Sequence, residues 1–242
     1  MSIAIILAAG KGTRMRSDLP KPIVPFLGKP IAVHIIDSFR KTGTEEIYLI
    51  VGYGAEQVKG TIGTGVRYCY QREQHGTAHA VKQVPEEVIR SNSTVFVFVG
   101  DSPLITAETI KKLESHHINS GASCTFLTAI FPIEFPYARI VRNKSHELIA
   151  VVEEKNATKE QLQIPELLSS HFVFNGEDLF QSLAEIKPDK DNGELYLTDI
   201  IGLMLNKGLK VETLPIDNYA ELVGLNTPED IAWAQKTIQS RK

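Results

Sequence analysis

A glycine-rich stretch that carries two separated cations holds the residue types best suited to chemistry. Residues 7–25 read LAAGKGTRMRSDLPKPIVP and follow an apolar run at residues 3–7. The small residues let the backbone approach a bulky ligand closely, and Arg14 and Lys21 add positive charge beside backbone N–H donors. Amides and cations both stabilise anionic oxygens. The stretch therefore predicts a phosphate-binding turn after the first strand.

Two better-known phosphate motifs do not fit this stretch. A dinucleotide fingerprint requires G-x-G-x-x-G, but Met15 stands where the third glycine would be. A Walker A loop requires G-x-x-x-x-G-K-[ST], and no such spacing starts at Gly10 or Gly12. The sequence therefore argues against an NAD-binding protein and against a P-loop ATPase.

An aspartate follows a second apolar run. Residues 95–99 read VFVFV and are followed by Gly100 and Asp101. An aspartate just past a buried parallel strand faces the crevice in which such sheets bind ligands. Its oxygens suit Mg²⁺, which keeps several waters and binds substrate phosphates. A turn or helix-capping role is the alternative, but the nearby phosphate turn favours a metal ligand at Asp101.

The segment 71–80, with the sequence QREQHGTAHA, follows a strand-like run and opens a helix. The amide of Gln71 offers both a donor and an acceptor, so it could read the edge of a nucleobase. Gly76 would allow a planar base to come close. His75 and His79 are four residues apart, but no third metal ligand is apparent. We therefore expect an exposed His75 and a packed His79.

Two further polar positions have two interpretations each. We expect a strand to end at Asn226 and a helix to begin at Pro228, so Asn226 is either a helix cap or a neutral oxygen ligand beside Asp101. Glu153 follows a strand-like run at 148–152. It either holds the hydroxyl groups of a sugar or lies in a solvated, charged turn.

The elements that must position these residues alternate between strand and helix in the first half. This order predicts an α/β fold with a doubly wound, mostly parallel, Rossmann-like sheet and helices on both faces. Ligands of such sheets bind at the carboxyl ends of the strands. We expect strands at 3–8, 47–51, 66–70 and 95–99, and helices after Pro30 and at 77–83 and 106–116.

The second half is expected to contribute mixed strands with shorter connections. We expect strands at 125–130, 139–142, 148–152, 171–175 and 211–215, helices at 176–186, 198–206 and 228–240, and a polar loop at 187–192. No Gly/Ser/Pro-rich linker divides the chain. We therefore expect a single domain over residues 1–242, with a nucleotide-binding part at about 1–105, a sugar-binding part at about 106–226 and a C-terminal helix at 227–242.

Composition limits the classes of partner. The chain has 242 residues, of which 43% are hydrophobic and 23% charged, with a net charge of −3 and no long basic block. Nucleic acid is therefore not an expected partner. The two cysteines form no C-x-x-C pair, which indicates free thiols in a reducing compartment. No apolar stretch approaches the ~20 residues that span a bilayer, so we expect a cytoplasmic protein without a membrane partner.

The five motifs, in this order, resemble the sugar-1-phosphate nucleotidyltransferase family. They are most similar to the bacterial N-acetylglucosamine-1-phosphate uridyltransferases, the N-terminal half of a bifunctional enzyme. The resemblance covers nearly the whole chain and extends to residues 153–158 (EEKNAT) and 194–201 (ELYLTDII). It implies a fold of the nucleotide-diphospho-sugar transferase type and Mg²⁺ as cofactor.

The resemblance also implies a role for individual residues of this chain. Those implied in catalysis are Arg14, Lys21 and Asp101; around the nucleotide, Leu7, Ala8, Ala9, Gly10, Gly12, Thr13, Gln71, Gly76 and Thr77; around the sugar, Ala138, Glu153, Tyr196 and Thr198; and around Mg²⁺, Asp101 and Asn226.

Three positions depart from the family pattern. Ala138 stands where the family has a glycine, Leu168 where it has a sugar-binding asparagine, and Val99 where it usually has an aromatic residue. A polar group in a pocket discriminates strongly between substrates. The triphosphate and metal positions are intact, but a sugar without an N-acetyl group, or another phosphorylated alcohol, remains open as the acceptor.

We expect an enzyme that joins an NTP, in the first place UTP, to a sugar 1-phosphate such as N-acetylglucosamine-1-phosphate, releasing pyrophosphate. A guanylyl- or cytidylyltransferase for another sugar or alcohol phosphate is one alternative. A nucleotide-binding regulatory protein without catalysis is another. No hexapeptide β-helix repeat is found in the sequence, so acetyl transfer is not expected, and the oligomeric state stays open.

Overall fold

The computed structural model describes residues 2–91 and 94–239. Most strands join one large sheet, and a small hairpin stands apart from it. The strands of the large sheet are β1 (Ser2–Ala8), β4 (Glu46–Val51), β5 (Arg67–Tyr70), β6 (Thr94–Val99), β7 (Cys124–Ile130), β8 (Ala138–Arg142), β9 (Leu148–Val152), β10 (Glu166–Leu168), β11 (His171–Phe174) and β12 (Val211–Pro215), and the hairpin pairs β2 (Pro25–Phe26) with β3 (Lys29–Pro30).

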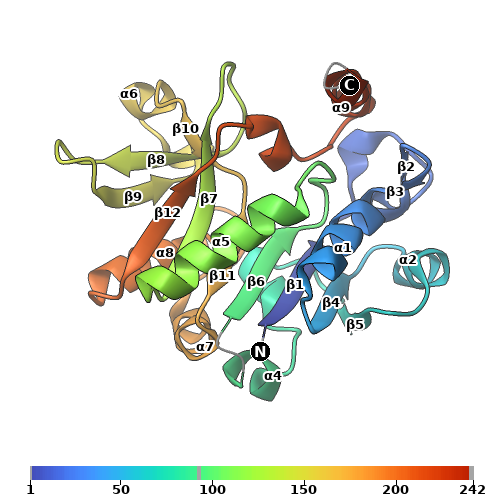
Figure 1. The fold of residues 1–242 in the computed structure, drawn as a ribbon, viewed down its shortest axis with the longest axis horizontal. Coiled ribbons are helices and arrows are strands. Elements are labelled where there is room, and N and C mark those ends of the chain that lie inside the picture. The colour runs from blue at the N-terminus through green and yellow to red at the C-terminus, as the bar shows by residue number, and fades with distance from the viewer. Residues whose placement is uncertain (1, 92–93, 240–242) are drawn as a thin grey trace.

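Helices cover both faces of the large sheet. In Figure 1, α1 and α5 lie in front of it, whereas α7 and α8 lie behind. The α-helices are α1 (Ile31–Thr42), α2 (Ala55–Ile62), α3 (Thr77–Val81), α4 (Glu86–Arg90), α5 (Ala107–Ser120), α6 (Lys159–Leu162), α7 (Gly176–Glu185), α8 (Asp199–Asn206) and α9 (Pro228–Gln239), and single 3-10 turns are η1 (Thr13–Met15), η2 (Lys21–Ile23), η3 (Glu154–Asn156) and η4 (Tyr219–Leu222).

The strand order is β5-β4-β1-β6-β11-β7-β10-β8-β9, with β12 paired to β7. β1 is parallel to both β4 and β6, and β4 is parallel to β5. β11 is antiparallel to β6 and β7, and β10 is antiparallel to β7 and β8. This arrangement confirms the predicted α/β fold, parallel in the first half and mixed in the second.

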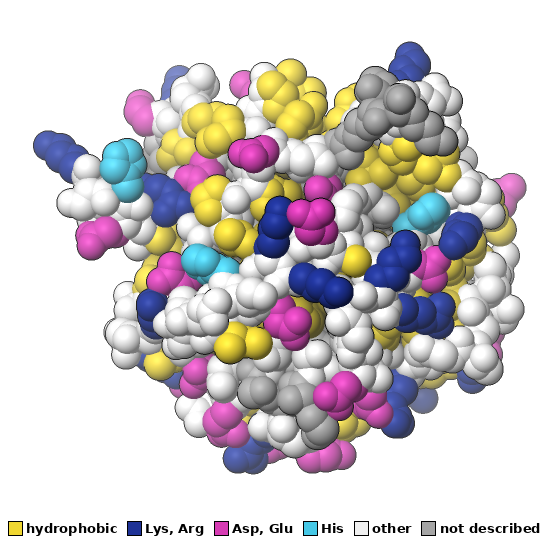
Figure 2. Space-filling model, in the orientation of Figure 1, with side chains coloured by type: hydrophobic (Ala, Val, Ile, Leu, Met, Phe, Trp, Pro, Cys, Tyr) yellow, Lys and Arg dark blue, Asp and Glu magenta, His cyan; other side chains and the backbone are white. Residues whose placement is uncertain are grey.

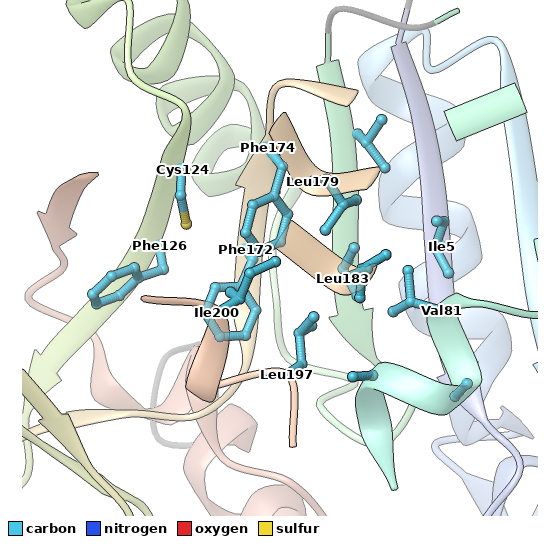
Figure 3. Packing of buried hydrophobic residues seen from close by; sticks show 14 of the residues in the cluster. Ile5, Val81, Cys124, Phe126, Phe172, Phe174, Leu179, Leu183, Leu197 and Ile200 are labelled. Atoms are coloured by element: carbon cyan, nitrogen blue, oxygen red, sulfur yellow. The ribbon is translucent and has the colours of Figure 1, made fainter. Parts of the chain in front are cut away.

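The continuous apolar runs in the strands reflect burial on both faces of the sheet. Along β1, Ile3 and Ile5 pack into one core cluster, whereas Ala4 and Ile6 pack into the cluster on the other side. Figure 3 shows the first cluster, where Phe172 and Phe174 of β11 lie near Leu179 and Leu183 of α7. The two cores hold the carboxyl ends of β1 and β6 side by side.

The surface is mixed in character. On the face drawn in Figure 2, acidic and basic side chains are interspersed, and hydrophobic side chains reach the surface in separate patches. Among the residues that the structure describes, no helix combines the length and the apolar character needed to cross a membrane.

Several elements differ from the sequence-based expectations. The short elements β10, α2, α4 and α6 were not predicted, because segments of three to eight residues give little periodicity. The expected strand ending at Asn226 is wrong: the chain there leaves η4 and runs as irregular backbone to α9. Of the helix expected at 228–240, the last residue lies outside the described residues.

Candidate active site

A cavity of about 520 Å³ opens where β1, β5 and β6 end. Loops that follow these three strands supply most of its lining, as expected for a parallel sheet. The sequence-predicted residues that line it are Leu7, Ala8, Ala9, Gly10, Gly12, Thr13, Arg14, Lys21, Gln71, Gly76, Thr77, Asp101, Tyr196 and Asn226.

The glycine-rich turn has a conformation that only glycine accommodates at one position. Gly12 has a φ of +59°, and a Cβ built there would lie 2.6 Å from Cβ of Lys21. The turn can therefore fold back so that Lys21, in η2, reaches the same cavity as Arg14, in η1. The sequence spacing of seven residues between the two cations becomes a pair that faces one ligand.

The charged centre of the cavity brings two oxygen atoms to one ammonium group. Nζ of Lys21 forms an ion pair with Oδ2 of Asp101 and donates to Oδ1 of Asn226 at 2.8 Å. Nη2 of Arg14 donates to the same Asn226 oxygen at 3.1 Å. Because Asp101 and Asn226 already converge on one cation, and both are hard oxygen donors, the pair fits Mg²⁺.

The start of α9 excludes one of the two roles predicted for Asn226, that of helix cap. Oγ1 of Thr227 accepts from the N–H of Asp230 at 3.1 Å, and the Asp230 carboxylate accepts from the N–H groups of Asn226 and Thr227. Thr227 is therefore the residue that caps α9. The Asn226 side chain points instead towards Lys21 and Arg14, and its Nδ2 donates to the carbonyl oxygen of Gly224 at 3.0 Å.

The base-reading candidate Gln71 is buried and has a fixed orientation. Its Nε2 donates to the carbonyl oxygen of Gly76 at 3.0 Å and lies 3.0 Å from Nδ1 of His79. Burial lowers the pKa of His79, which keeps the ring neutral and lets Nδ1 accept. The amide nitrogen of Gln71 is thereby engaged inside the protein, and its carbonyl oxygen is the atom left for a ligand.

The structure gives another reason for a glycine at position 76 than the predicted approach of a base. A Cβ at Gly76 would lie 2.4 Å from the carbonyl oxygen of Leu195, and φ there is +97°. Leu195 also donates from its N–H to the carbonyl oxygen of His75 and accepts from the N–H of Ala78, both at 2.9 Å. Glycine is needed at this position because a second chain segment packs against it, whether or not a base is bound.

The expected pattern of the two histidines is found. His75 is exposed and contacts Glu73 at 2.7 Å, whereas the ring of His79 is half-buried against Gln71. Within residues 2–91 and 94–239, no group of three or more His, Cys, Asp or Glu side chains is placed to hold a metal ion.

Of the four residues predicted around the sugar, all of them described by the structure, Tyr196 alone lines the cavity. Asn192 donates to Oη of Tyr196 at 2.7 Å, and Nζ of Lys155 lies 4.6 Å above its ring. Oγ1 of Thr198 donates to Oε1 of Glu153 at 2.5 Å, which places these two predicted residues together but outside the lining of this cavity.

Ala138 lies in the core, and its methyl group is not part of the cavity lining. Ala138 is 2% exposed and lies opposite Leu168, which is equally buried, across the β8–β10 pair. Both belong to the apolar cluster that also contains Phe172. Its methyl group is packed into the core, and a contact of the Ala138 backbone with a sugar stays a prediction.

Sequence reasoning missed some lining residues. Gln74, Glu194 and Val99 all contribute to the cavity wall. Glu194 lies there because Leu195 pairs with residues more than a hundred positions earlier in the chain. No local sequence pattern predicts such a contact. The similarity of residues 194–201 to a family segment was the one signal that pointed to this region.

Comparison with known protein families agrees with this geometry. Residues 4–196 match the family described as the MobA-like NTP transferase domain. The chain belongs to this family. The predicted enzyme class, a nucleotidyltransferase, is thereby confirmed.

Curated relatives of this NTP transferase domain are longer proteins. It is 42% identical over 238 residues to the bifunctional protein GlmU of Staphylococcus haemolyticus, covering 98% of this chain and 53% of the relative. It is 40% identical over 238 residues to the GlmU of Staphylococcus carnosus, covering 98% of the chain and 52% of that relative. The chain spans about half the length of these relatives, and the predicted resemblance to the N-terminal half of a bifunctional enzyme is confirmed.

Solved structures show the same fold for the NTP transferase domain. A Bacillus anthracis protein assigned as a glucose-1-phosphate thymidylyltransferase superimposes with a TM-score of 0.77 at 19% identity, covering 98% of this chain and 95% of that one. A nucleotidyl transferase from Methanothermobacter thermautotrophicus gives a TM-score of 0.67 at 15% identity, covering 100% and 99%. At these identities the likeness concerns the fold alone, which is of the expected nucleotide-diphospho-sugar transferase type.

Proposed function

We propose that this domain is a Mg²⁺-dependent nucleotidyltransferase that joins UTP to a sugar 1-phosphate and releases pyrophosphate. The observation that carries the proposal is the convergence of the Asp101 and Asn226 oxygens on the ammonium of Lys21, beside Arg14 and the glycine-rich turn. A cluster of two cations and two hard oxygen donors suits a metal-bound triphosphate. The similarity to the N-terminal half of the GlmU proteins points to N-acetylglucosamine-1-phosphate as the first acceptor to test.

The orientation of Gln71 is compatible with UTP. With its Nε2 engaged by Gly76 and His79, its free carbonyl oxygen can only accept a hydrogen bond. Uracil presents a ring N–H donor on its pairing edge, as guanine does, whereas cytosine and adenine offer only an exocyclic amino group there. An amino group also donates, so each of these bases could donate to the carbonyl oxygen of Gln71, and the choice of UTP rests on the similarity to the GlmU proteins.

The chain's own residues would bring two anions together. Bound at Asp101 and Asn226, Mg²⁺ would neutralise charge on the triphosphate. Arg14 and Lys21 would hold phosphate oxygens, and the backbone N–H groups of the glycine-rich turn would add hydrogen bonds. A phosphate oxygen of the acceptor then forms a bond to the α-phosphorus while the bond to pyrophosphate breaks. The acceptor oxygen is already ionised, so positioning and charge neutralisation supply the rate gain.

A second acceptor class is supported by the buried pair Ala138 and Leu168. Both side chains face the apolar cluster, and neither offers a hydrogen-bonding group. Both residues lie outside the cavity lining and give an acceptor no polar partner, and a sugar phosphate without an N-acetyl group, or a phosphorylated alcohol, would not need the asparagine that the family has in place of Leu168. This alternative keeps the same metal and nucleotide chemistry, with a different acceptor and, if guanine is bound, a different NTP.

The experiment that tests the proposal is pyrophosphate release in the presence of Mg²⁺. Four NTPs would be combined with a panel of sugar 1-phosphates and small alcohol phosphates. We expect one productive pair that contains UTP and an amino-sugar phosphate. Binding of an NTP with no release for any pair would instead support a nucleotide-binding regulatory protein.

Asp101→Ala provides the matched test of the metal assignment. The substitution removes a ligand oxygen from a partly exposed side chain of the cavity wall, so we expect turnover to fall by about 10²-fold or more while the protein stays folded. Asp37→Ala, which removes a partly buried carboxylate paired with Lys29 and Arg40 outside the cavity lining, is the control. A rate close to that of the unsubstituted protein would contradict a metal role for Asp101.

A further inference from the structure

The segment that carries Asn226 is held by a tyrosine from a distant part of the chain. Tyr137 lies directly before β8, and its Oη accepts from the N–H of Gly224 at 2.9 Å. Ser169, from the end of β10, donates to the carbonyl oxygen of Leu222 in the same connection. The irregular backbone between η4 and α9 is therefore anchored to β8 and β10.

Gly224 contacts both proposed metal ligands. A Cβ at Gly224 would lie 2.8 Å from Oδ1 of Asp101, so the Asp101 carboxylate rests directly against this glycine. The carbonyl oxygen of Gly224 accepts from Nδ2 of Asn226 at 3.0 Å, which turns Oδ1 of Asn226 towards the cavity. The next residue, Leu225, donates from its N–H to the backbone carbonyl oxygen of Asp101 at 2.8 Å. A shift of Gly224 would move both oxygen donors.

Tyr137 is itself rigidly placed. Its ring stacks on Phe135 with centroids 5.4 Å apart and meets Phe131 edge-on at 5.6 Å. Nη1 of Arg139 donates to the carbonyl oxygens of Tyr137 and Phe135 at 2.5 and 3.1 Å. Burial, with the nearby charge of Asp101, raises the pKa of Tyr137 to about 12, so the hydroxyl stays neutral.

We propose that Tyr137 is a positioning residue, which fixes Gly224 and thereby sets the Asp101 and Asn226 oxygens at the spacing that a divalent cation requires. The proposal rests on the metal site of the proposed function. Residues that orient metal ligands typically change metal affinity 10–100-fold when they are lost. Tyr137 acts through Gly224 and touches neither reactant, so its effect belongs to metal binding.

Tyr137→Phe tests the proposal because it keeps the stacked ring and removes the hydroxyl that accepts from the Gly224 N–H. Mn²⁺ alone is titrated into the protein and free Mn²⁺ is measured by electron paramagnetic resonance. We expect the dissociation constant for Mn²⁺ to rise about 10-fold. In the assay, the Mg²⁺ concentration for half-maximal rate should rise by a similar factor, while the KM for NTP at saturating Mg²⁺ changes less than twofold.

Tyr68→Phe is the matched control. Its hydroxyl also has a backbone partner, since it donates to the carbonyl oxygen of Gly63 at 2.5 Å, and neither residue lines the cavity. We expect Mn²⁺ binding of this variant to equal that of the unsubstituted protein. Thermal unfolding of both variants shows that the comparison is made between folded proteins.

The outcomes separate this inference from the proposed function. Unchanged Mn²⁺ binding in Tyr137→Phe, with normal binding by the unsubstituted protein, would overturn the positioning role and leave the metal site intact. A lower melting temperature with unchanged Mn²⁺ affinity would show a merely structural role and overturn it equally. An unsubstituted protein that binds no Mn²⁺ and releases no pyrophosphate would overturn both.

Discussion

Lys21 occupies the point on which the Asp101 and Asn226 oxygens converge. Its ammonium bonds both oxygens, and its side chain is only 14% exposed. Two cations cannot share one position, so a metal ion that binds these oxygens must displace the ammonium. The phosphates of a nucleotide would offer Lys21 a new partner. In the absence of a metal ion, Lys21 can therefore hold the Asp101 and Asn226 oxygens together. Once a metal ion had displaced its ammonium, the same side chain could bind phosphate.

Lys21→Met should separate these two roles. Without the ammonium, Mn²⁺ meets no competing cation at Asp101 and Asn226, so its affinity should increase about 10-fold, which corresponds to about 1.4 kcal/mol. Turnover should fall at least about 10²-fold, because a charge that stabilises the phosphates is lost. Titration of free Mn²⁺ and the pyrophosphate assay measure the two effects. Lys29→Met, which breaks only the exposed pair with Asp37, should change neither; weaker Mn²⁺ binding in Lys21→Met would refute the competition.

Among the elements, the β10–β11 connection combines a tight turn with a special backbone conformation. Ser170 lies between the two strands and has a φ of +58°, in the left-handed region. The neighbouring Ser169 donates to Leu222 and so ties this turn to the η4 segment. The left-handed conformation strains the backbone at Ser170, because serine has a Cβ.

Ser170→Gly should stabilise the protein. Left-handed backbone destabilises an L-residue by about 1–2 kcal/mol, and glycine removes this strain. Glycine also loses more conformational entropy on folding, which offsets about 0.5–1 kcal/mol of the stabilisation. The net increase of about 0.5–1 kcal/mol should raise the melting temperature by about 1–4 °C. Chemical denaturation measures the change, and Ser145→Gly, at a residue without positive φ, should not stabilise. A lower free energy of unfolding for Ser170→Gly would show that the serine makes a compensating contact.

For the whole molecule, buried histidines link stability to pH. Burial lowers the pKa of His117 to about 4, where Nδ1 lies 3.0 Å from Oγ1 of Thr125. Burial also lowers the pKa of His171 to about 4; its ring lies against Phe98, and neither of its nitrogens has a hydrogen-bond partner among the described residues. The folded protein therefore keeps both rings neutral at a pH where the unfolded chain would protonate them.

The sign of the pH effect follows from linkage. Between about pH 6.5 and 4 the unfolded chain binds more protons at His117 and His171 than the folded protein does, so stability falls as the pH falls. Each histidine contributes about 1.4 kcal/mol per pH unit in the steepest part of this window. Urea denaturation at pH 7.5, 6 and 5 should show the loss, and His171→Phe should reduce it. His75→Gln, at an exposed ring, should leave it unchanged; a pH-independent free energy of unfolding would contradict the assignment.

The sequence by itself determined the first half of the fold and the residues at its strand ends. Alternating strand and helix patterns require parallel strands, and right-handed crossovers bring their carboxyl ends to one edge. The glycine-rich turn and Asp101 follow β1 and β6, which are neighbours in the sheet, so local pattern was enough to place them together. The position of the phosphate turn and of Asp101 in one cavity was predictable for that reason.

The tertiary structure alone decided the contacts between segments far apart in the chain. Packing makes Thr227 and not Asn226 the cap of α9, places Glu194 in the cavity wall, and buries Ala138 opposite Leu168. The bond from Tyr137 to Gly224 spans 87 positions in the chain. Such contacts depend on how whole elements pack against each other, and this packing cannot be predicted from a local pattern of residue types.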